Sequence, residues 1–312
     1  MTLERPPKLL LLDSASLYFR AFYGVPDQRK DPGEPPTNAV RGFLDMIASL
    51  VTTFQPTHLV ACWDNDWRPK FRVDAIPTYK THRLADGSLE EEQVPDDLSP
   101  QVSVIRDALA ALGIARVGAD GYEADDVIGT LVHQHRGGMP VDVVTGDRDL
   151  FQLVDDAHGI RVVYTARGGV RDPDLVDQAF LAAKYAVPTG SAYADMAVLR
   201  GDTSDGLPGV AGIGEKTAAA LIERYGDLPT LLTAVADGDP ALKGAQRTRL
   251  EAALSYLEVA PAVVRVAHDA PVAEHDGALP TEVADVDLLG RLAEDYGLTN
   301  SFKRVLAAFD II

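Results

Sequence analysis

The segment Leu9-Leu-Leu-Leu-Asp13 decides how the first half of the chain is interpreted. It is a run of four apolar residues that ends at an aspartate, and the pattern returns at Leu59-Val-Ala-Cys-Trp-Asp64 and at Val141-Asp-Val-Val-Thr-Gly-Asp147. Short apolar runs separated by amphipathic segments are typical of a mostly parallel sheet covered by helices. Ligands of such sheets bind beyond the carboxyl ends of the strands. All three candidate strands place an aspartate there, which is the first indication of a functional site.

Helical periodicity and glycine content divide the rest of the chain. A glycine-dense stretch at 201–214 leads into a helical pattern, and the residue pattern from there on differs from that of the strand-rich part before it. We predict a core at 1–184 that includes a polar region at about 66–100, a helical module at 185–258, and a strand and helices at 259–312 that complete the core. The predicted helices are 38–54, 101–112, 123–136, 215–225, 228–236, 246–257, 286–296 and 301–309, with a short strand at 263–266.

Composition limits the function classes. The 312 residues are 46% hydrophobic, which excludes intrinsic disorder. The net charge is −18, and an acidic total argues against binding to a polyanion. A single cysteine, Cys62, excludes an intramolecular disulfide and a cysteine-based zinc site. Because no apolar run resembles a secretory signal or a membrane span, we expect a soluble, cytoplasmic protein without membrane contact.

Acidic residues cluster at the predicted strand ends and helix starts. Taken singly, each has a structural explanation as a helix cap or turn residue. Together they would repel one another unless cations were bound, and oxygen ligands without His or Cys suit Mg²⁺ or Mn²⁺. Their number suggests two ions about 4 Å apart, as in nucleases and polymerases. The nine candidate metal ligands are Asp13, Asp64, Glu123, Asp125, Asp126, Asp147, Asp149, Asp202 and Asp205.

The glycine-dense stretch predicts a phosphate contact of a different kind. It resembles a P-loop, but Glu215 separates the last glycine from the lysine, so we expect no nucleotide cofactor. A tight turn before a helix lets backbone N–H groups approach a phosphate of duplex DNA, although a purely structural turn is the alternative. The candidate DNA-binding residues are Gly209, Gly212, Gly214, Lys216 and Thr217.

Basic residues follow the first two predicted strands. Arg20 comes after the Asp13 strand, and Arg72, Lys80 and Arg83 come after the Asp64 strand. Arginine and lysine beside a metal centre hold the phosphate that reacts. A solvated charge run is the structural alternative. We favour the functional interpretation and predict these four residues as catalytic.

These motifs, in this order, resemble the bacterial 5′-nuclease family, which comprises the 5′→3′ exonuclease domain of DNA polymerase I and its free-standing flap-endonuclease relatives. The similarity runs from Leu9 to about Arg304. Its motifs are Leu12-Asp-Ser14 with Arg20, Trp63-Asp64 with Phe71-Arg72, Tyr79-Lys80-x-x-Arg83, Gly121-Tyr-Glu-Ala-Asp-Asp126, Thr145-Gly-Asp-Arg-Asp-Leu150, and Gly201 to Lys216.

The resemblance implies a PIN-like α/β nuclease core with an inserted helix–turn–helix-like module. It also implies two or three divalent ions held by the nine acids, and Lys80 and Arg83 near the scissile phosphate. The glycine turn of that family often binds K⁺ through backbone carbonyls, here near Ser204, Val210 and Ile213. One departure is the polar region 84–97, where a 5′ strand would pass, because it carries six acids and no Lys or Arg.

The expected function is therefore a metal-dependent 5′ nuclease, with both 5′→3′ exonuclease and 5′-flap endonuclease activity. Its substrates would be flapped, nicked or gapped duplex DNA, and RNA–DNA hybrids, and its products would carry a 5′-phosphate and a 3′-hydroxyl. We expect a free-standing monomer that acts in replication and repair. The alternatives are a catalytically silent junction-binding protein of the same fold and a small-molecule phosphatase that uses Asp147 and Asp149.

Overall fold

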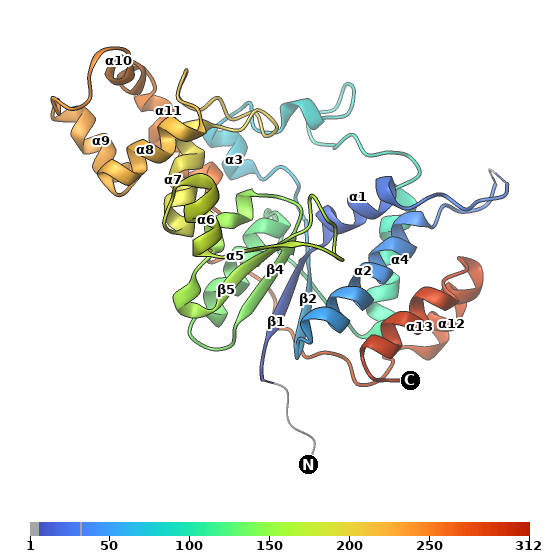
Figure 1. Cartoon of the computed structure of the whole chain (residues 1–312). Coiled ribbons are helices and arrows are strands. Elements are labelled where there is room, and N and C mark those ends of the chain that lie inside the picture. Colours follow the sequence, from blue (N-terminus) through green and yellow to red (C-terminus); the bar gives the residue numbers. More distant parts are fainter. Residues whose placement is uncertain (1–5, 32) are drawn as a thin grey trace.

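A six-stranded sheet forms the centre of the molecule in the computed structural model, which describes residues 6–31 and 33–312 (Figure 1). The strand order is β3-β2-β1-β4-β5-β6. The first five strands are parallel, and β6 is antiparallel to β5. The strands are β1 (Leu9–Asp13), β2 (His58–Trp63), β3 (Ala115–Gly118), β4 (Val141–Thr145), β5 (Ile160–Tyr164) and β6 (Asp174–Val176). The three strands predicted from the sequence are confirmed.

The strand order determines where a ligand can bind. From β1 the chain continues to β2 and β3 on one side, and it then returns to β4 on the other side of β1. The connections therefore diverge between β1 and β4, and a crevice opens beyond the carboxyl ends of strands at such a switch point. Asp13 is the last residue of β1, so it lies at this crevice.

Alternating residues of the strands supply two hydrophobic cores. Leu9 and Leu11 face one core, and Leu10 and Leu12 face the other. All four are almost fully buried, which is why β1 is apolar throughout instead of alternating with polar residues. The core with Leu10 is covered by α1 (Ser14–Gly24), α2 (Asn38–Phe54), α4 (Ser99–Leu112), α12 (Val286–Asp295) and α13 (Thr299–Ala308).

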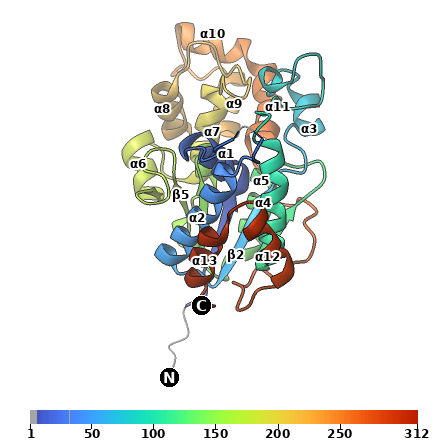
Figure 2. The ribbon, with the colours of Figure 1, turned by 90° about the vertical axis from the view of Figure 1, so that its right-hand side faces the viewer.

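The other core continues into a group of helices at the far end of the molecule (Figure 2). The helix α5 (Ala124–His135) packs against the sheet. Beyond it lie α6 (Gln178–Tyr185), α7 (Gly190–Arg200), α8 (Glu215–Tyr225), α9 (Leu228–Ala236), α10 (Gly244–Ala252) and α11 (Leu254–Val264). We refer to α7–α11 as the helical module.

Two predictions in this region are wrong. The helix expected at 246–257 is two helices that break at Ala253, and the strand expected at 263–266 is absent, so the boundary predicted at residue 258 falls inside α11. Hydrogen bonds from side chains explain the second error. Gln152 donates to the carbonyl of Val264 and accepts from the amide of Val266, so these backbone groups do not pair with a strand.

The chain between β2 and α4 crosses from the helical module back to the α1 side (Figure 1). It contains α3 (Lys70–Ala75), a single 3₁₀ turn (Thr81–Arg83), and a short antiparallel pairing of Leu84 with Glu92. Within residues 6–31 and 33–312, no helix has the length and apolar character needed to cross a membrane.

Candidate active site

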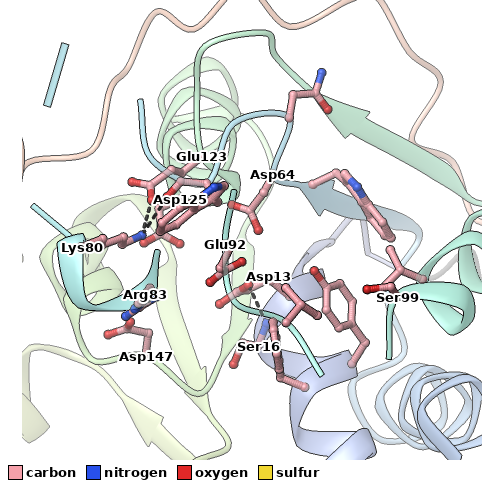
Figure 3. Close-up of a pocket in the computed structure, with 18 of the residues that line it drawn as sticks. Asp13, Ser16, Asp64, Lys80, Arg83, Glu92, Ser99, Glu123, Asp125 and Asp147 are labelled. Atoms are coloured by element: carbon pink, nitrogen blue, oxygen red, sulfur yellow. Dashed lines mark hydrogen bonds and ion pairs between the residues drawn. The ribbon is translucent and has the colours of Figure 1, made fainter. Parts of the chain in front are cut away.

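An open cavity of about 790 Å³ lies at the carboxyl ends of β1, β2 and β4 (Figure 3). Two basic side chains, Lys80 and Arg83, also line it. Strand ends and the start of α5 bring its acids together from distant parts of the sequence. The predicted metal ligands in its wall are Asp13, Asp64, Glu123, Asp125 and Asp147.

Asp13 is held by hydrogen bonds to both carboxylate oxygens. Its Oδ1 accepts from the amide of Ser16 at 3.1 Å and thereby caps α1, and its Oδ2 accepts from Thr145 Oγ1 at 2.7 Å. The same hydroxyl accepts from the amide of Asp147 at 2.9 Å. Burial and the charges of Asp64 and Asp147 raise the pKa of Asp13 to about 7, against the lowering effect of its hydrogen bonds. Thr145, which the sequence analysis did not single out, thus positions two acids.

The start of α5 brings three more acids to the cavity. Asp64, directly after β2, accepts from the amide of Ala124 at 2.8 Å. Glu123 is the N-cap residue of α5, and Asp125 lies in the first turn. Burial, reinforced by neighbouring carboxylates, raises the pKa of Asp64 and of Asp125. The helix dipole stabilises negative charge here, but it does not neutralise so many acids.

A second acidic group adjoins the cavity through Asp147. Burial and the charges of Asp147, Asp205 and Asp202 raise the pKa of Asp149 to about 8. Arg83 donates to Asp205 at 2.8 Å. The structure therefore brings eight of the nine predicted ligands into one region.

Asp126 is the exception, and Arg72 explains why. Arg72 is 2% exposed, and its guanidinium donates to both oxygens of Asp126 at 2.7 and 2.8 Å and also to Glu123. Asp126 in addition accepts from the amide of Ala267 at 2.9 Å. The prediction that Arg72 contacts a phosphate is contradicted, because a buried, fully paired guanidinium cannot reach one. Tyr79, which begins the Tyr79-Lys80-x-x-Arg83 motif but was given no role from the sequence, donates to Glu123 at 2.7 Å.

Arg20 also lies outside the cavity, contrary to the prediction. Its guanidinium donates to the carbonyl of Ala166 at 3.3 Å and lines a separate cavity together with Gly169 and Arg171. The helix α1 starts at the acidic cavity, but Arg20 lies almost two turns further along it. That displacement points the side chain towards the loop between β5 and β6.

Lys80 and Arg83 lie in the wall of the cavity beside the acids. The Lys80 ammonium forms an ion pair with Glu123 (Figure 3). Arg83 pairs with Asp205. The amide of Lys80 donates to the carbonyl of Asp205 at 2.9 Å, which ties this segment to the glycine-dense loop. Each cation therefore neutralises one acid of the site.

The glycine-dense loop contacts the same segment. Gly206 has φ +74°, and a Cβ there would lie 2.1 Å from the carbonyl oxygen of Thr78. Only glycine fits this close approach. Gly209 and Gly212 also have positive φ, with little space for a side chain.

The loop ends at α8 with an open helix start. Gly214 is the N-cap residue, provides no side-chain cap, and has nothing within 4 Å of the position of a Cβ. Lys216 is exposed in the first turn, and the amide of Thr217 is already bonded to the carbonyl of Gly214. Uncapped N–H groups beside an exposed lysine are suited to a phosphate.

The donor set fits hard divalent cations. The candidate ligands that line the cavity are all carboxylates, without His or Cys, and such oxygen ligands suit Mg²⁺ and Mn²⁺ better than zinc. Burial first, and then repulsion between neighbouring acids, raises the pKa of Asp13, Asp125 and Asp149, and a bound cation would offset both effects. No three His, Cys, Asp or Glu side chains of the described part of the chain already converge on a common point as a preformed metal site.

The fold and site define a two-part α/β protein with a carboxylate-lined cavity beside a helical domain. Two family models match it: the 5′-3′ exonuclease N-terminal resolvase-like domain over residues 8–186, and the 5′-3′ exonuclease C-terminal SAM fold over residues 188–287. The chain belongs to the 5′-3′ exonuclease family. This confirms the resemblance drawn from the motifs.

Named relatives agree with the family models. The chain is 56% identical to a 5′-3′ exonuclease of Streptomyces coelicolor, over 95% of this chain and 98% of that protein. It is 47% identical to a 5′-3′ exonuclease of Mycobacterium tuberculosis, over 97% and 98%. DNA polymerase I of Mycobacterium bovis is 38% identical, but the match covers 30% of that longer protein.

Solved structures share the fold. The T5 D15 protein, co-crystallised with metal ions, superposes with a TM-score of 0.65 at 18% identity, over 97% of this chain and 99% of that one. Human GEN1 in complex with Holliday junction DNA superposes with a TM-score of 0.63 at 17% identity, over 98% and 73%. These likenesses support the α/β core with a helical domain predicted from the sequence.

Proposed function

We propose that this protein is a divalent-metal-dependent, structure-specific 5′ nuclease that cleaves flapped, nicked or gapped duplex DNA and RNA-containing strands. The observation that carries the proposal is the cavity in which five of the candidate metal ligands lie together with Lys80 and Arg83. The 56% identity to a named 5′-3′ exonuclease over nearly the whole chain supports it. Cleavage would be both exonucleolytic and at 5′ flaps, by a monomer, leaving a 5′-phosphate and a 3′-hydroxyl.

Mg²⁺ or Mn²⁺, as two or three ions, would be held by acids among the eight that lie in this region. Bound ions of this kind lower the pKa of water and stabilise charge on a phosphodiester. The protein's own part is to fix the acids and to bind the phosphate. Thr145 orients Asp13, and Tyr79 orients Glu123. The chain offers Lys80 and Arg83 as the cations that contact the scissile phosphate.

The helical module would grip the duplex on one side of the cleavage point. The open start of α8 and Lys216 offer sequence-independent contacts to the DNA backbone. K⁺ at the carbonyls near Ser204, Val210 and Ile213 would strengthen this contact. We assign catalysis to the sheet domain, with residues 1–184 as its main part, and duplex binding to the module.

End-labelled cleavage of matched 5′-flap, nicked, gapped and single-stranded substrates, in Mg²⁺, Mn²⁺ and EDTA, tests the proposal. We expect cutting of the junction substrates with either metal and none with EDTA. Asp64→Asn should abolish cutting while flap binding stays nearly unchanged, because Asp64 lies in the acidic cavity and not on the module.

Other outcomes would favour the competing functions. Binding of flaps by the unaltered protein without cleavage in either metal would indicate a silent junction-binding protein. Hydrolysis of a generic phosphomonoester without flap cutting would indicate a phosphatase. If Asp64→Asn cleaved flap DNA in Mg²⁺ as fast as the unaltered protein does, the metal-site assignment would be refuted.

A further inference from the structure

The acidic region between the 3₁₀ turn and α4 folds back into the active-site cavity. Residues 83–93, which we call the acidic hairpin, pair through Leu84 and Glu92. The amide of Ala85 donates to the carbonyl of Glu91, and the amide of Gln93 donates to the carbonyl of Arg83, both at 2.8 Å. The hairpin is therefore ordered by its own backbone, and it begins at one of the two basic residues of the site.

Contacts with the cavity wall hold the hairpin in place. Trp67 Nε1 donates to the carbonyl of Glu90 at 2.9 Å. Glu90, Glu91 and Glu92 all line the same cavity as the five candidate metal ligands. Figure 3 draws Glu92 between Asp64 and Asp13, in the middle of the acidic group. The three glutamates therefore occupy space that a substrate would need.

The glutamates add strongly to the negative charge of the cavity. The five lining ligand acids together with Lys80 and Arg83 carry about three negative charges. Glu90, Glu91 and Glu92 raise this total to about six negative charges. A cavity with the glutamates in place therefore repels a phosphodiester more strongly than the same cavity without them.

We propose that the acidic hairpin is an internal competitor of the nucleic-acid strand: its glutamates take the place of substrate phosphates, and DNA must displace the hairpin to be cut. This rests on the proposed nuclease function. A single-stranded DNA that contacts only the cavity has no other contact whose binding free energy could offset the free energy of displacing the hairpin. A junction that also binds the helical module gains binding free energy that offsets this cost, so the hairpin increases the preference for junctions.

Hydrogen–deuterium exchange on the intact protein separates this proposal from the proposed function. Flap DNA is added in Mg²⁺ to the full-length Asp64→Asn variant, which should bind the flap without cutting it, and peptides from 83–94 and 201–217 are followed. We expect 201–217 to become protected and 83–94 to exchange faster, because the amides of Ala85 and Gln93 lose their partners. Protection of both regions would overturn the hairpin proposal alone. No protection of 201–217 would count against nuclease-type DNA binding itself.

Neutral variants test the charge argument. The triple variant Glu90→Gln, Glu91→Gln, Glu92→Gln should bind a single-stranded oligonucleotide about tenfold more tightly at low salt, with a smaller gain for flap DNA. A control removes three acids that do not line the cavity, Asp86→Asn, Asp96→Asn and Asp107→Asn, and matches the change in net charge. It should bind as the unaltered protein does.

Two results would overturn the proposal. Equal tightening in both triple variants would assign the effect to net charge. Weaker binding of Mn²⁺ to the free protein after the glutamate substitutions, with unchanged oligonucleotide affinity, would make the glutamates metal ligands instead of competitors. Metal binding is measured by calorimetry without DNA, so it is independent of activity.

Discussion

Replacing Asp149 with asparagine should stabilise the protein when no metal is present. The carboxylate accepts no hydrogen bond from the described residues, because only the backbone N–H and carbonyl of Asp149 are bonded, to Asp147 and Gln152. The substitution therefore removes a charge and leaves both of these backbone hydrogen bonds intact. What it relieves is the repulsion and burial that raise the pKa of Asp149 from 3.8 to about 8.

The sign and size of the effect follow from this shift. A carboxyl whose pKa is raised on folding binds its proton more tightly in the folded state, so stability is lost as pH rises from about 4 to 8. A rise in pKa from 3.8 to about 8 corresponds to about 6 kcal/mol at most, at roughly 1.4 kcal/mol per pKa unit. Since the Asp149 side chain is partly exposed, water screens the repulsion, and we expect about 1–3 kcal/mol at pH 8.

Thermal melting with EDTA and with Mg²⁺, at about pH 5 and about pH 8, measures the effect. Asp149→Asn should melt several degrees above the unaltered protein at pH 8 in EDTA, and close to it at pH 5. Mg²⁺ should raise the melting temperature of the unaltered protein more than that of the variant. The unaltered protein offers the ion one more carboxylate ligand, so its folded state binds the ion more tightly and gains more stability. Asp107→Asn, an exposed change on α4, is the control and should alter little.

Two results would refute this reasoning. If Asp149→Asn melts lower than the unaltered protein at pH 8 in EDTA, the acids of the site do not repel one another as the structure indicates. If Mg²⁺ stabilises both proteins equally, Asp149 is not a ligand. Cleavage of flap DNA by the unaltered protein and by Asp149→Asn is measured alongside, and we expect the variant to have lost this activity.

Three further substitutions have effects that can be predicted from contacts. Arg72→Leu leaves the buried Asp126 without its cation and removes one of the two cations that pair with Glu123, so it should lower the free energy of unfolding by about 3–5 kcal/mol, measured in urea. Gly206→Ala should be destabilising by more than about 1 kcal/mol, because its Cβ would meet the carbonyl of Thr78, whereas Gly214→Ala, with open space around it, should change little in the same assay. Lys216→Ala should weaken flap binding and reduce its salt dependence by about one charge, measured by anisotropy, without changing the melting temperature.

The sequence predicted the parts of the fold that depend on local pattern. The apolar run from Leu9 to Leu12 predicted a buried strand, and the aspartate after it was therefore expected at the carboxyl end of that strand. The helix α8 was predicted with its observed ends, because glycines precede it and Gly226 follows it. Periodicity and turn chemistry suffice for such elements.

Predictions that depend on the direction of a side chain were less successful. Nothing in the sequence distinguishes Arg72, which is buried against acids, from Arg83, which lines the cavity. Arg20 lies on the helix that starts at the site but points to another loop. The β-branched run at Val263 was interpreted as a strand because the amide of Gln152, more than a hundred residues away, could not be foreseen as its partner. These outcomes depend on tertiary contacts alone.

The arrangement of Lys80 and Arg83 explains how so acidic a chain can bind a polyanion. Both cations are paired with acids of the proposed metal site, Lys80 with Glu123 and Arg83 with Asp205. A divalent ion on those acids would compete with the ion pairs and release both cations towards the cavity. Metal and phosphate would then bind cooperatively, because each stabilises the arrangement that the other requires. Under the proposed function, the net charge of −18 would therefore not exclude nucleic-acid binding but would make it conditional on divalent cations.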